Sequence, residues 1–90
     1  MPYIKAAYRI DLNVGLNELY DQLDFLIDKY PNDKNGMLTY LIYMLVNEYY
    51  FGSFESYSDG IKVLECAKME FYRKRVAPYE DLKIEEHGDI

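Results

Sequence analysis

The apolar positions of residues 16–30 repeat with the period of an α-helix. They recur at intervals of three and four residues, which places them on one face of a helix: Leu16, Leu19, Tyr20, Leu23, Leu26, Ile27 and Tyr30. Pro31 and the polar residues that follow it predict the end of this helix. Residues 1–15 show only a brief alternation of apolar and polar positions, and we interpret them as an irregular N-terminal arm that lies on the helices.

The segment 37–51 is apolar on almost every side of a predicted helix. Only three polar residues interrupt it, namely Thr39, Asn47 and Glu48. It is shorter than the ~20 residues that cross a membrane, so we interpret it as a central buried helix that stops before Gly52. We expect four of its residues in the core: Leu38, Leu41, Ile42 and Leu45. Because two neighbouring helices do not cover every side of it, we expect a second subunit to cover the rest.

A third helix is predicted over residues 59–76. Ser58 fits the N-cap position, and Ala77 with Pro78 forms a stop signal. This helix carries two apolar stripes, the first with Leu64, Ala67 and Phe71, the second with Ile61, Met69, Tyr72 and Val76. Residues 78–90 form an acidic C-terminal tail. The sequence therefore predicts a compact all-α domain of three helices, a single domain over residues 1–90, assembled as a homo-oligomer.

The charge balance narrows the choice of partners. Sixteen acidic residues against ten basic ones give a net charge of −6, which disfavours general nucleic-acid binding. A single cysteine excludes a disulfide within the chain, and no segment has the pattern of a signal peptide or a membrane span, so we expect a cytoplasmic protein. The eleven tyrosines supply aromatic area either to a small core, which we favour, or to a stacked ligand.

Residues suited to catalysis or metal binding are sparse. His87 is the only histidine, and it lacks the partners of a usual zinc site. Cys66 lies within the predicted third helix, away from the helix N-terminus where reactive thiolates are found. No glycine-rich phosphate loop occurs. We therefore expect no metal, no cofactor and no catalysis, with one enzyme alternative in which Glu65, Glu70 and Glu80 surround a divalent metal.

Residues 70–81 combine basic side chains with aromatic rings. Guanidinium groups bind phosphate or carboxylate, and tyrosine rings stack on nucleotide bases. This combination predicts a site for a small anionic, nucleotide-like ligand, with the ligand-binding residues Tyr72, Arg73, Arg75 and Tyr79. Arg73 and Arg75 point about 160° apart on a helix, so the site is expected between two subunits. The alternative is that these bases complement the helix dipole at the C-terminal end.

Residues 64–90 carry a specific pattern close to LECAKxEFYRxxVAPYED. This stretch resembles the C-terminal half of a small family of uncharacterised proteins from bacteria, archaea and phages. The first four residues and several positions between 36 and 45 also fit the family, whereas residues 5–35 match it poorly and His87 replaces the usual asparagine. The resemblance implies an all-helical fold and a phage or prokaryotic origin, and it implies no particular activity.

Three classes of function follow from these observations. The first is a non-catalytic protein that sequesters or senses the anionic ligand at a subunit interface, as a phage or prokaryotic regulator would. The second is a protein–protein interaction module without a small-molecule ligand. The third is the carboxylate and metal-dependent enzyme, which ranks last because the chain has no nucleophile–base pair.

Overall fold

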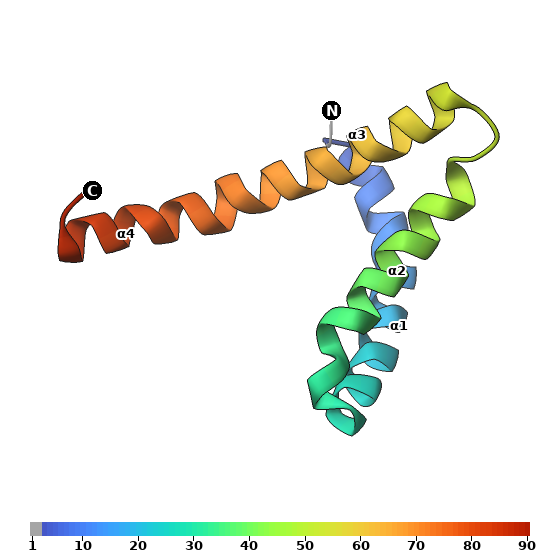
Figure 1. The fold of residues 1–90 in the computed structure, drawn as a ribbon. Helices are drawn as coiled ribbons and strands as arrows, with labels where there is room; N and C mark the ends of the chain where they lie inside the picture. The colour runs from blue at the N-terminus through green and yellow to red at the C-terminus, as the bar shows by residue number, and fades with distance from the viewer. Residues whose placement is uncertain (1–2) are drawn as a thin grey trace. The chain divides into compact units, whose positions relative to one another are not determined.

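The structure, a computed structural model, describes residues 3–90, and within this range it contains helices and no strands. The helices are α1 (Ala6–Lys29), α2 (Lys34–Tyr49), α3 (Phe54–Phe71) and α4 (Ala77–His87), with a 3-10 turn η1 (Pro31–Asp33) and a π-helical segment η2 (Tyr72–Val76) (Figure 1). The predicted all-α fold class is confirmed. The chain divides into two units, Tyr3–Phe51 and, among the described residues, Gly52–Ile90. The single domain expected over residues 1–90 stays a prediction.

The first unit is a helical hairpin in which α1 and α2 lie side by side (Figure 1). Helix α1 ends at Lys29, and the N–H of Tyr30 donates to the carbonyl of Leu26 at 2.8 Å. Pro31 follows and opens η1, because proline has no N–H to continue an α-helix and its fixed φ suits the first position of a new turn. The predicted end of the first helix is therefore confirmed.

Helix α1 begins ten residues before the predicted start, at Ala6 instead of Leu16. The irregular arm expected over residues 1–15 is wrong for 6–15, and residues 1–2 lie outside the described part. Tyr8 and Leu12 precede Leu16 at intervals of four, so they continue the apolar stripe of the helix upstream. The alternation of polar and apolar positions that we interpreted as an extended arm was too short to outweigh this helical spacing.

Helix α2 is covered on one side only. Leu38 and Leu41 are half-buried, whereas Ile42 is 51% exposed and Leu45 is 57% exposed. The prediction that Ile42 and Leu45 are core residues is wrong within their own unit, because α2 has one helical neighbour there, whereas a central helix needs several. Of the described residues, Leu23 of α1 is the only large apolar side chain that is buried.

The second unit is one continuous helix from residue 54 to residue 87, formed by α3, η2 and α4 in succession (Figure 1). The hydroxyl oxygen of Ser53 accepts a hydrogen bond from the N–H of Ser56 at 3.1 Å, so Ser53 is the N-cap and the prediction of Ser58 is wrong. The expected stop at Ala77 and Pro78 is also wrong, and most of the expected acidic tail is helix α4. Gly52, the first described residue of this unit, has a φ of +89°, a conformation that favours glycine.

Candidate functional site

The π-helical segment η2 lies directly before Pro78, and the proline accounts for it. In an α-helix the ring of Pro78 would crowd the carbonyl of the residue four positions earlier, and that carbonyl would have no N–H partner. In η2 the N–H of Ala77 instead donates to the carbonyl of Tyr72, five residues earlier. The wider turn accommodates the proline without ending the helix. It also places three of the four predicted ligand-binding residues, Tyr72, Arg73 and Arg75, on a π-turn, a feature that is frequent at functional sites.

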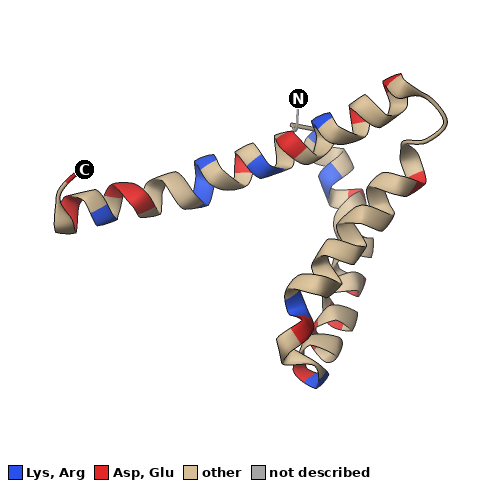
Figure 2. Cartoon of the chain, in the orientation of Figure 1, with Lys and Arg blue, Asp and Glu red and all other residues tan. Residues whose placement is uncertain are grey.

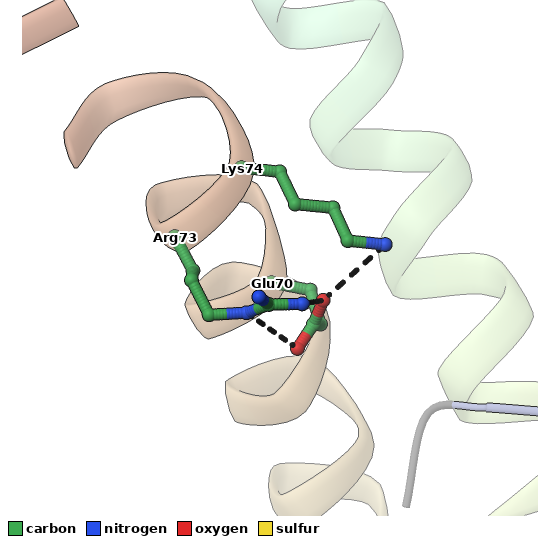
Figure 3. A network of polar contacts seen from close by, with 3 residues as sticks. All are labelled: Glu70, Arg73 and Lys74. Atoms are coloured by element: carbon green, nitrogen blue, oxygen red, sulfur yellow. Dashed lines mark hydrogen bonds and ion pairs between the residues drawn. The ribbon is translucent and has the colours of Figure 1, made fainter. Parts of the chain in front are cut away.

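Glu70 binds two of the three consecutive bases of this segment (Figure 3). Arg73 donates from Nη2 to Glu70 Oε2 at 3.0 Å and from Nε to Oε1 at 3.4 Å, and Lys74 Nζ lies 3.5 Å from the same Oε2. The Glu70 side chain is 24% exposed, and the two basic side chains are more than half exposed. Each ion pair joins residues three or four positions apart on the helix, and the two pairs offset part of the positive charge expected to bind an anion.

Tyr72 is held by the carboxylate of the following helix. Its hydroxyl donates to Glu80 at 3.1 Å to Oε2 and 3.2 Å to Oε1. This hydrogen bond, with the negative charges of Glu80 and then Asp81 nearby, raises the pKa of Tyr72 above its usual value of 10.0. The hydroxyl is therefore a neutral donor at physiological pH.

Arg75 and Tyr79 differ from the other two predicted ligand residues. Arg75 is exposed and has no hydrogen bond or ion pair with any residue that the structure describes. Tyr79 is 60% exposed, and Lys83 Nζ lies 5.4 Å from the centre of its ring. Lys83 lies four positions after Tyr79 on α4 and so shares its helix face, and its Nζ also pairs with Glu86 Oε2 at 3.2 Å. Arg73 and Arg75, two residues apart, do not face each other.

The carboxylates considered for a metal site are engaged elsewhere. Glu65 lies 3.9 Å from Lys68, while Glu70 and Glu80 have the partners described above. Within residues 3–90, no three histidine, cysteine or acidic side chains are placed so that they could hold a metal ion together. Cys66 is a half-buried free thiol.

A second candidate surface is an apolar row on α2 that no other helix of its unit covers. We call it the α2 stripe and define it by Leu38, Ile42, Leu45 and Tyr49. Tyr49 is 73% exposed, and Leu38, at the other end, is half-buried. Helix α1 lies against a different side of α2, where a groove between the two helices is lined by residues that include Leu19, Leu23 and Leu26 of α1 and Met37, Tyr40 and Leu41 of α2. Sequence reasoning placed most of the α2 stripe in the core and missed it as a surface.

These features define an all-α protein whose candidate sites are a charged π-helical turn and an uncovered apolar helix face. The chain belongs to a family described as Domain of unknown function (DUF6899), whose family model matches residues 1–90. Searches of curated proteins and of solved structures gave no match. Among the described residues, none of the helices has both the length and the apolar character that crossing a membrane requires.

Proposed function

We propose that this chain is a protein–protein interaction module that works in association with another protein chain. The observation that carries the proposal is the extent of exposed apolar side chain on both units. Large apolar side chains are more than half exposed in both units, among them Ile42, Leu45 and Tyr49 of α2 and Phe54, Ile61 and Met69 of α3. Any contact with the other unit lowers an exposed fraction, so within its own unit each of these side chains is at least this exposed.

Helix lengths prevent the chain from covering this surface by itself. The continuous helix of residues 54–87 is about 50 Å long, whereas α1, the longest helix of the other unit, is about 36 Å long. Any placement of the two units therefore leaves part of the long helix without a neighbour from the same chain. That helix carries exposed large apolar residues along its length: Phe54, Tyr57, Ile61, Val63, Met69, Phe71, Tyr72, Tyr79, Leu82 and Ile84.

Small-angle scattering with light scattering and an apolar dye tests the proposal. A compact monomer of 90 residues has a radius of gyration of about 12 Å. We expect the purified chain either to associate or, where it is monomeric, to exceed this radius and bind the dye. A monomeric mass with a radius near 12 Å and no dye binding would show that one chain covers its own apolar faces, and the proposal would be refuted.

A second candidate function is the binding of a small anionic, nucleotide-like ligand, and the exposed, unpaired Arg75 and the exposed ring of Tyr79 support it. Because Tyr72 and Arg73 already have partners within the chain, we expect Arg75 and Tyr79 to make most of the contact, with the other two at the edge of the site. A thermal-shift screen against nucleotides tests this, because a ligand of the native state raises its melting temperature. Arg75→Ala should abolish the shift, while Lys62→Ala, an exposed base on α3, should leave it unchanged.

The remaining expectations belong to the same proposal. A non-catalytic interaction module fits a chain whose candidate nucleophile, Cys66, and histidine, His87, lie on different parts of the long helix. A phage or prokaryotic regulator that acts in the cytoplasm fits the C-terminal pattern of residues 64–90. The carboxylate and metal-dependent enzyme has no supporting observation, because Glu65, Glu70 and Glu80 face Lys68, two bases and Tyr72 respectively.

A further inference from the structure

We propose that the α2 stripe is the contact face of a homodimer, in which the hairpins of two copies pack as a four-helix bundle. This inference rests on the proposed interaction function and names its first partner, a second copy of the chain. It also names the face that the second copy occupies.

The spacing of the α2 stripe is that of a helix–helix seam. Its four residues follow one another at intervals of four, three and four, the pattern of the a and d positions of a coiled coil. Within the hairpin no helix packs along the α2 stripe, because α1 lies against the side of α2 that carries Met37 and Leu41. A four-helix bundle gives each helix two neighbours, and it would place the α2 stripe in the bundle core.

The charge pattern favours a second copy over a different protein as the occupant. From residue 35 to residue 47, α2 has no charged side chain. In Figure 2 the middle of its ribbon is tan, without the blue of Lys and Arg or the red of Asp and Glu. In a two-fold dimer each surface meets itself, so a charged stripe would repel its own copy, whereas an uncharged one does not. A partner selected to complement a chain of net charge −6 would instead use a charged part of the surface.

A dimer contact through α2 requires exposed apolar surface on the α2 stripe. A typical interface takes about 800 Å² from each partner, and permanent dimers take more. In the hairpin, Ile42 is 51%, Leu45 57% and Tyr49 73% exposed, so the α2 stripe offers apolar surface to such an interface. The competing occupant of the α2 stripe is the long helix of the same chain, which would cover the stripe without a second copy.

Light scattering and sedimentation equilibrium over a range of micromolar concentrations test the inference. We expect the wild-type chain to have twice the monomer mass of 10.7 kDa. Ile42→Lys and Leu45→Lys should each give a monomer, because a lysine cannot be buried in the bundle core without a partner. Ile61→Lys is the matched control, since Ile61 is an exposed apolar residue on α3 (62%), outside the hairpin, and it should leave the dimer intact.

Leu45→Ala tests the same contact in case the lysine variants fail to fold. It keeps a good helix former at the position, and it should weaken the dimer by at least about tenfold in Kd while the helical circular dichroism signal is retained. A dimer that tolerates all three α2 changes, or that only Ile61→Lys disrupts, would overturn the inference and leave the interaction module standing. A monomeric wild-type chain with a large radius and dye binding would do the same. A compact monomer that binds no dye would overturn both.

Discussion

Leu23 is the side chain on which the hairpin depends most, and Leu23→Ala tests this. Leu23 is 9% exposed, and it lies in the groove between the two helices with Leu26 and Met37 among its neighbours. Removing three carbon groups forfeits about 2.4 kcal/mol of transfer free energy at about 0.8 kcal/mol each. The groove opens to solvent, so the surroundings relax more easily than in a closed core, and the cavity adds little. We expect the free energy of unfolding to fall by about 2–3 kcal/mol.

This loss is large for a chain of this size. A 90-residue domain has a total stability of roughly 5–13 kcal/mol, so the variant would lose a substantial fraction of it. Urea denaturation followed by circular dichroism measures the loss, with both proteins at the same concentration because association adds to apparent stability. Val14→Ala is the control: Val14 is 64% exposed on the same helix, and we expect a change within about 0.5 kcal/mol. An equal loss in the two variants would refute the reasoning that Leu23 holds α1 and α2 together.

Three further predictions concern the π-helical turn. Glu70→Gln should lower the free energy of unfolding by less than about 1 kcal/mol, because the two basic partners of Glu70 are exposed. Urea denaturation at low and high salt should show a smaller loss at high salt, because salt screens the charges. An equal loss at both salt concentrations would contradict an electrostatic cause. Glu80→Gln should bring the pKa of Tyr72 back towards 10.0, measured by its ring carbon shift in NMR, and an unchanged pKa would contradict the hydrogen bond. In the wild type, the raised pKa means that Tyr72 contributes its stability fully below pH 10 and loses it as the pH rises through the folded-state value. Pro78→Ala should return η2 to an α-helix, with a new protected N–H at residue 78 in hydrogen exchange; persistence of the π-turn would show that the proline does not cause it.

The sequence pattern was sufficient to predict those structural features that depend on residues close together in the chain. The end of α1 before Pro31 and the pairs of Glu70 with Arg73 and Lys74 follow from spacing along a helix and from the backbone chemistry of proline. The start of α1 was misjudged because Tyr8 and Leu12 fit both a short strand and a helix over so few residues. The stop at Pro78 was misjudged for a different reason, since a single widened turn allows a helix to pass a proline, and composition does not predict that turn.

The sequence by itself determined that the protein is all-helical, because helix formation depends on contacts three and four residues apart that any stretch of the chain carries with it. It also indicated that α2 has more apolar surface than a short chain can cover. Only the tertiary structure decided which apolar side chains are covered: Leu23 of α1 is buried, while Ile42 and Leu45 remain exposed on the α2 stripe. Burial depends on which elements lie against a face, and periodicity shows that a face is apolar without showing what covers it.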